Sequence, residues 1–151
     1  MKKINSLFES IFSPVIPHIH YLLRFILGIS FFLHGFGKLP ISQGFIGWLG
    51  SQGVIYPELI AYFVAWGEIL SGIGIIFGGL LIKFYPITSN LLTRVSGGII
   101  TIIMVSALIV AHSDWNIFIG ERGKILFASE QLFLLTLGTY FLVVGNNLNN
   151  E

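Results

Sequence analysis

A few ionisable side chains interrupt the long apolar stretches of this sequence. His34 and Lys38 lie one helical turn apart at the end of the run LLRFILGISFFLHGFGKL, and Glu68 and Glu130 lie in two later apolar stretches. Ionisable groups inside a membrane are costly and by default mark a functional site. A histidine that titrates near neutral pH, beside desolvated carboxylates, is suited to proton transfer. We therefore predict a proton relay with His34, Glu68 and Glu130 as its catalytic residues.

The composition indicates that these residues lie in a membrane protein. The chain has 151 residues, of which 54% are hydrophobic and only 10% are charged, whereas soluble domains carry about 25% charged residues. The net charge of +1 argues against nucleic acid as a partner. Because there is no cysteine, disulfides, thiolate-bound metals and thiol redox chemistry are excluded for this chain. The four histidines remain possible metal or haem ligands, but we predict no metal site.

Four stretches are long and apolar enough to cross the hydrocarbon core, which takes about 20 helical residues. We therefore predict an all-α, polytopic membrane protein in which residues 1–151 form one domain, a bundle of four transmembrane helices in contact with the lipid bilayer. The predicted spans are about 21–39, 59–82, 91–111 and 125–145. The polar tail after residue 145 is expected to fray.

Two shorter segments are predicted to lie at the membrane surface. Residues 4–12 place apolar side chains at helical spacing and are too few to span, which is typical of an interfacial amphipathic helix. Pro14 and Pro17 are expected to end that helix. In the first loop, 40–58, aromatic residues such as Trp48 favour a second short interfacial helix.

The distribution of cationic residues predicts the orientation. Five of the eight Lys and Arg residues lie at one side of the predicted spans, so the positive-inside rule places both termini in the cytoplasm. Arg24 and Arg94 lie near cytoplasmic ends and are predicted to anchor those ends by snorkelling. His18 and His20, two residues apart on different helix faces, are predicted to be interfacial without a further role.

The spacing of the ionisable residues predicts that they share one depth. At about 1.5 Å per helical residue, His34 and Glu130 lie about 9 Å, and Glu68 about 13 Å, below the outer ends of their spans. Lys38 and His112 would cover this polar layer from the outer side. A plain alternative is an ion pair that only fixes the helix register. The loop residues Asp114, Glu121 and Arg122 are expected to be solvated.

The same positions carry a resemblance to a known family. Over about residues 20–145 the chain resembles the DoxX family of small four-helix membrane proteins. The resemblance implies a prokaryotic protein of the cytoplasmic (inner) membrane, linked to quinone-coupled oxidoreductases such as thiosulfate:quinone oxidoreductase. Motif by motif, it implies functional roles for Arg24, His34, Lys38, Glu68 and Glu130. The matching segments are Leu23-Arg24, Phe32-Leu33-His34-Gly35, Lys38-Leu39, Gly47-Trp48-Leu49, Glu68-Ile69-Leu70-Ser71-Gly72 and Glu130.

These features together predict an integral membrane subunit of a quinone-linked oxidoreductase system. Quinone is the expected ligand, without a covalently bound cofactor, and its headgroup would contact His34, Lys38, Trp48 and His112. Three alternatives stay open: a non-enzymatic assembly or packing subunit, a small proton-coupled transporter, and a haem subunit with His34 and His112 as axial ligands. Other membrane subunits, or further copies of the chain, are the expected protein partners.

Overall fold

The regular elements of the described residues are all helices, apart from one isolated bridge between Asn116 and Ile125, which confirms the predicted all-α class. The computed structural model describes residues 2–112, 115–121 and 123–146, apart from the side chains of residues 16 and 17. These residues form, in chain order, α1 (Lys2–Phe12), α2 (Ile16–Phe36), α3 (Gln43–Ser51), α4 (Pro57–Leu80), the 3-10 turn η1 (Leu81–Lys83), α5 (Pro86–Ala111), the 3-10 turn η2 (Leu126–Ala128) and α6 (Glu130–Val144).

Three helical segments of the described chain are long and apolar enough to cross a membrane. They are His18–Phe36, Pro57–Lys83 and Pro86–Ala111, and they correspond to the first three predicted spans. The fourth apolar helix, α6, has only 15 residues. Length and hydropathy therefore support a multi-pass membrane protein with at least three crossings.

Proline residues begin three of these helices. Pro17, Pro57 and Pro86 each lie in the first turn of α2, α4 and α5, where a backbone without an N–H group loses no helical hydrogen bond. The prediction that Pro17 ends the first amphipathic helix is therefore wrong, because α1 ends at Phe12 and Pro17 starts the next helix. Pro86 likewise starts α5 about one turn earlier than the predicted boundary at residue 91.

The chain before α6 also departs from the prediction of a helix from about residue 125. Ile125 is extended, Leu126–Ala128 form a 3-10 turn, and the Ser129 side chain caps α6 by accepting a hydrogen bond from the Leu132 N–H. A serine is a favoured N-cap because its oxygen satisfies an otherwise unpaired amide. Glu130 is consequently the first residue of α6 and does not lie about two turns inside a span.

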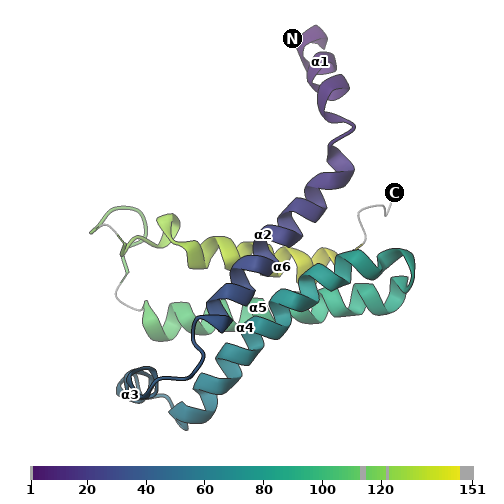
Figure 1. Ribbon diagram of the computed structural model, residues 1–151. Helices are drawn as coiled ribbons and strands as arrows, with labels where there is room; N and C mark the ends of the chain where they lie inside the picture. Colours follow the sequence, from purple (N-terminus) through teal and green to yellow (C-terminus); the bar gives the residue numbers. More distant parts are fainter. Residues whose placement is uncertain (1, 113–114, 122, 147–151) are drawn as a thin grey trace.

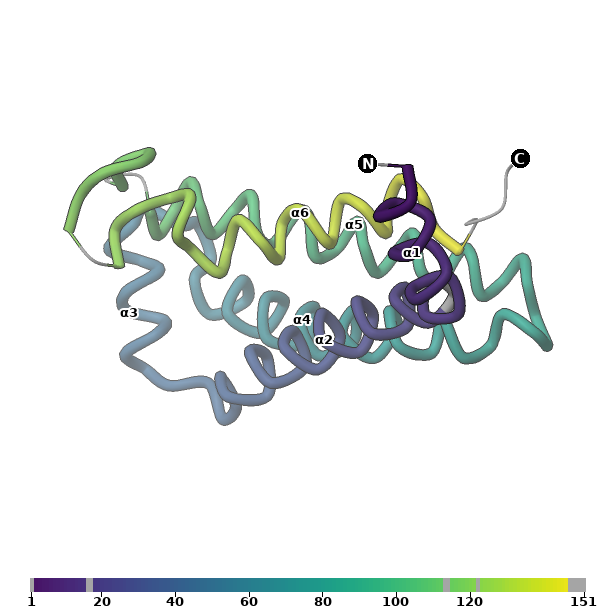
Figure 2. The backbone as a smooth tube through the Cα atoms, turned by 90° about the horizontal axis from the view of Figure 1, so that it is seen from above, coloured from purple at the N-terminus to yellow at the C-terminus, as the bar shows by residue number. Residues whose placement is uncertain are grey.

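The four long helices pack in sequence around one core. α2 lies along α4, α4 along α5 and α5 along α6, whereas α2 and α6 make little contact (Figure 1). Figure 2 shows α3 across one end of the bundle, and Figure 1 shows α1 projecting away from the other helices. The core that these four helices enclose contains Leu27, Phe31, Ile75, Ile100, Met104, Leu134 and Phe141.

Glycines permit the closest helix crossings. A Cβ atom on Gly72 would lie 2.5 Å from the carbonyl oxygen of Gly28, so α2 and α4 meet backbone to backbone. A Cβ atom on Gly97 would lie 2.7 Å from the carbonyl oxygen of Gly138, so α5 and α6 meet in the same way. Small residues at such crossings are typical of membrane helices.

The adjacent residues Gly97 and Gly98 allow this packing to be tested. Gly97→Ala should lower the free energy of unfolding by about 1–3 kcal/mol, because its methyl group would meet the backbone of α6. Gly98→Ala should be neutral or slightly stabilising, since its methyl group would meet only a Leu142 side-chain carbon at 3.5 Å and alanine favours helix. Thermal unfolding in detergent measures both variants, and equal effects would contradict the crossing.

Candidate functional site

An ion pair between α4 and the segment after α2 forms the buried part of the site. The Lys38 Nζ donates to Oε2 of Glu68 at 2.5 Å and to the backbone oxygen of His34 at 3.2 Å. Glu68 is only 3% exposed. Gly35 permits this approach, because a Cβ atom there would lie 2.8 Å from the Cβ of Glu68. The Lys38 ammonium compensates the charge of the Glu68 carboxylate, whose burial among apolar helices would otherwise cost free energy.

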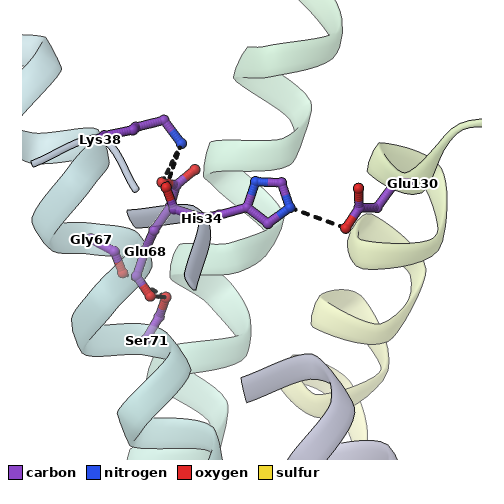
Figure 3. Close-up of polar contacts among 6 residues, drawn as sticks. All are labelled: His34, Lys38, Gly67, Glu68, Ser71 and Glu130. Carbon is purple, nitrogen blue, oxygen red and sulfur yellow. Dashed lines mark hydrogen bonds and ion pairs between the residues drawn. The ribbon is translucent and has the colours of Figure 1, made fainter. Parts of the chain in front are cut away.

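A second pair joins α2 to the start of α6. Nε2 of His34 lies 3.0 Å from Oε1 of Glu130, and the Ser30 hydroxyl donates to the same oxygen at 3.3 Å. The side chains are 38% and 58% exposed, so this pair is more accessible than the first. Figure 3 shows the His34 imidazole extending toward Glu130, while Lys38 and Glu68 face each other on its other side.

Three of these four side chains, those of Lys38, Glu68 and His34, line a cavity of about 430 Å³, and Glu130 is not among its lining residues. Lys38 and Glu68, with the imidazole of His34 beside them, form what we call its charged wall, and Trp48 belongs to its aromatic wall on α3. The remaining wall is almost entirely apolar, apart from Gln131 and Ser106. It comprises Phe45, Leu49, Val54, Ile60, Val64, Ile103, Met104, Ala107, Val110, Ala111 and Leu134. An apolar cavity with a few convergent polar groups is typical of a small-molecule site.

The structure thus brings together most of the residues predicted for the polar layer. Lys38 links the two pairs through the backbone oxygen of His34, and no hydrogen bond joins Glu68 directly to Glu130 within the described residues. Among the described residues, the hydrogen bonds that connect Glu68 with Glu130 therefore run through Lys38 and His34. Trp48, predicted for the ligand headgroup, lines the cavity.

His112, predicted from its depth to cover the polar layer and contact the ligand headgroup, lies outside the cavity wall. It is absent from the cavity wall formed by the described residues, and its ring packs on Trp115 with a centroid distance of 3.9 Å. The prediction depended on depth alone, which gives no information on the direction of a side chain. Asp114 and Arg122 lie outside the described residues, whereas Glu121 is exposed and pairs with Lys124 at 3.6 Å.

Arg24 forms a second polar cluster near the opposite end of α2, and the prediction that it snorkels is wrong. The residue is 2% exposed. Its guanidinium donates to the Ile75 oxygen at 3.0 Å, to the Thr93 hydroxyl at 3.0 Å and to the Asn146 side-chain oxygen. The Phe141 ring lies 4.6 Å from its central carbon. Arg24 therefore connects α2, α4, α5 and the end of α6.

Sequence reasoning missed the partners of Arg24. Nε2 of His20 lies 2.8 Å from the guanidinium, and His20 is 5% exposed, which corrects its prediction as an interfacial residue. The spacing of four between His20 and Arg24 is a signal for this contact, since such residues share a helix face. Asn146, only 8% exposed, gave no signal in a tail expected to fray.

Arg94 also contacts the end of α6. It donates to the Leu142 oxygen at 3.1 Å and the Val144 oxygen at 3.4 Å. A cation near the last carbonyls of a helix satisfies groups that have no partner within the helix. Arg94 therefore connects α5 with the end of α6, and its anchoring role in lipid stays a prediction.

Comparison with known proteins gives the family. A family model described as DoxX matches residues 19–84, a segment that contains His34, Lys38 and Glu68. A protein of Bacillus subtilis (strain 168) named "Putative oxidoreductase CatD" is 34% identical over 123 residues, which cover 82% of this chain and 81% of that protein. The chain belongs to the DoxX family. No solved structure matches it.

Within this DoxX chain, the buried pair makes a testable contribution to stability. Lys38→Met should lower the free energy of unfolding by about 3–5 kcal/mol, because the Glu68 carboxylate stays buried without its cation. The double variant Lys38→Met/Glu68→Gln should recover part of that loss. Lys83→Met, at the exposed end of η1, should stay within about 0.5 kcal/mol of the wild type. Denaturant titration in detergent measures all three variants, and equal losses from Lys38 and Lys83 would contradict the pairing.

Proposed function

We propose that this DoxX-family chain is an integral membrane subunit of a quinone-linked oxidoreductase system, and that its cavity holds the quinone headgroup. The observation that carries the proposal is the charged wall of Lys38, His34 and Glu68 on an otherwise apolar cavity of about 430 Å³. A quinone has a headgroup with polar oxygens and an apolar tail. The headgroup would face the charged wall, and the tail would lie against the apolar residues. The name of the Bacillus subtilis relative supports oxidoreduction in general.

The residues of the cavity have distinct proposed roles. Lys38 and His34 orient the headgroup oxygens, and Trp48 packs beside the ring. Glu68 exchanges a proton with the ligand, and His34 with Glu130 conducts it toward the accessible side, since exposure rises from 3% at Glu68 to 58% at Glu130. Because the chain contains no cysteine and no recognised cofactor motif, we propose that a partner subunit or a bound cofactor supplies or accepts the electrons.

The proposed membrane placement has four crossings in a prokaryotic cytoplasmic membrane. The 15 residues of α6 extend about 22 Å, less than the hydrocarbon thickness of about 30 Å. The loop before α6 compensates for this in our proposal. Its apolar side chains are exposed, with Phe118 stacked on Phe127 at 5.0 Å and Ile119 88% exposed. This loop would enter the outer interface and extend the apolar length of α6.

The proposal also assigns the two ends of the bundle to the two sides of the membrane. The Arg24 guanidinium donates to the Gly145 oxygen at 3.3 Å, so the first part of α2 and the end of α6 lie at the same end of the bundle. We assign that end to the cytoplasmic side, because most Lys and Arg residues belong to it. α1, with exposed Ile4, Leu7 and Phe8, would lie in the inner interface, and α3 in the outer one.

The proposed placement of the loop can be tested by single-cysteine labelling, since the natural chain has no cysteine. A polarity-sensitive fluorophore on Ile119→Cys should emit at shorter wavelength in nanodiscs and be quenched by spin-labelled lipid. On Glu121→Cys, an exposed polar position of the same loop, it should be quenched by aqueous iodide instead. Preferential iodide quenching at both positions would exclude insertion of the loop.

Ligand binding can be tested with a cavity-filling variant. A decyl-tailed benzoquinone at 100 times its Kd should stabilise the wild type by about 2.7 kcal/mol, seen as a higher midpoint of thermal unfolding. Ala107→Phe should weaken binding about tenfold or more, because it overfills the cavity wall. Val105→Phe, an exposed position on the same helix, should bind like the wild type. A wild-type protein without protection would contradict the proposed function.

A further inference from the structure

The hydrogen-bonding capacity of Lys38 is only partly used. Its ammonium has three N–H donors, and two of them are directed to Oε2 of Glu68 and the backbone oxygen of His34. No further hydrogen bond from this nitrogen to a described residue is found. Since Lys38 lines the cavity and is 26% exposed, one donor remains for a ligand.

The Glu68 carboxylate offers an acceptor to the same cavity. Its Oε2 accepts from Lys38, whereas its Oε1 accepts no hydrogen bond from the described residues. That oxygen is also not among the fully buried side-chain atoms without a partner, which are Nδ1 of His20 and Nε of Arg24. Oε1 of Glu68 is therefore not fully buried, and the cavity that Glu68 lines is accessible space beside this carboxylate.

His34 adds a second acceptor when its imidazole is neutral. Its Nε2 faces the Glu130 carboxylate at 3.0 Å, and an ionised carboxylate only accepts hydrogen bonds. In the neutral tautomer that donates Nε2–H to this carboxylate, Nδ1 is left as an acceptor. Figure 3 shows this nitrogen on the side of the ring away from Glu130.

The charged wall thus combines a donor on Lys38 with acceptors on Glu68 and His34. A quinone carbonyl only accepts hydrogen bonds, so it pairs with Lys38. The acceptor atoms of Glu68 and His34 then face the lone pairs of the carbonyl oxygen without a hydrogen bond. A hydroquinone hydroxyl both accepts and donates, so it pairs with Lys38 and with Glu68 at once. We infer that the cavity selects the reduced, hydroxyl-bearing ligand, a hydroquinone, over the corresponding quinone.

This inference rests on the proposed function, because it assigns the preferred form of the ligand at the same site. It concerns binding alone and requires no electron transfer. It also gives Glu68 a defined position relative to the ligand, since the hydroxyl proton is directed at its carboxylate. A buried group that loses a ligand partner is penalised, and a ligand that cannot donate should therefore bind less tightly.

The test compares three ligands that share one decyl tail: a benzoquinone, its hydroquinone and the dimethyl ether of that hydroquinone. Calorimetric titration into the full-length protein in nanodiscs, without oxygen, gives the three Kd values. We expect the hydroquinone to bind about tenfold tighter than either of the others, as one additional charge-assisted hydrogen bond predicts. The ether matters because it keeps the aromatic ring and both acceptor oxygens of the hydroquinone but has no hydroxyl proton.

A variant reports on the acceptor itself. Glu68→Gln carries an amide N–H₂ that can donate to a quinone carbonyl, so the ratio of the quinone Kd to the hydroquinone Kd should fall by about tenfold. Glu58→Gln has the same chemistry at an exposed position in the first turn of α4, outside the cavity. Its ratio should equal that of the wild type.

The outcomes separate this inference from the proposed function. A wild type that binds none of the three ligands overturns both. Quinone binding as tight as hydroquinone binding, or ether binding as tight, overturns the inference and leaves the quinone site in place. The wild-type ligand series decides the question even where Glu68→Gln does not fold.

Discussion

The buried ion pair between Lys38 and Glu68 is the constraint on which the arrangement of this bundle depends. A carboxylate that is 3% exposed among apolar helices requires a cation within hydrogen-bond distance. Lys38 can supply it because α2 ends at Phe36 and the chain turns toward α4. Gly35 lets the backbones approach closely enough for the pair to form. The cavity begins at this pair, and its charged wall follows from the same requirement.

A comparable requirement is met differently at the other end of the bundle. The Arg24 guanidinium is as deeply buried as Glu68, but the partners described for it are uncharged: backbone oxygens, the Thr93 hydroxyl, the His20 ring and the Asn146 amide. A Cβ atom on Gly79 would lie 2.7 Å from Cδ of Arg24, so the side chain is tightly enclosed. α2 and α6 make little contact along their length. The hydrogen bonds of His34 with Glu130 and of Arg24 with the end of α6 therefore connect these two helices near both ends.

The sequence predicted the cluster around Lys38 and Glu68 because its signals are local and chemical. Ionisable residues in apolar runs are conspicuous, and alternating helix directions indicate which of them share a level, so His34, Lys38 and Glu68 were found. Glu130 was found with the wrong position, because the turn before Ser129 depends on backbone hydrogen bonds such as Leu126 to Asn116 that no periodicity encodes. Snorkelling of Arg24 was the wrong inference, since it assumes an open path to water that the packing of α4, α5 and α6 closes.

The contrast between the two clusters bears on which of them can exchange protons. The cluster around Arg24 holds a permanent cation among neutral partners, and an arginine does not lose its proton in proteins. Its hydrogen bonds therefore fix the helices and offer no exchangeable acid. The cluster around Glu68 combines two carboxylates, an imidazole and an ammonium, each of which can change its protonation, beside a cavity of about 430 Å³. The proposed ligand site would require both clusters, because its side chains would have to keep their spacing while their charges change.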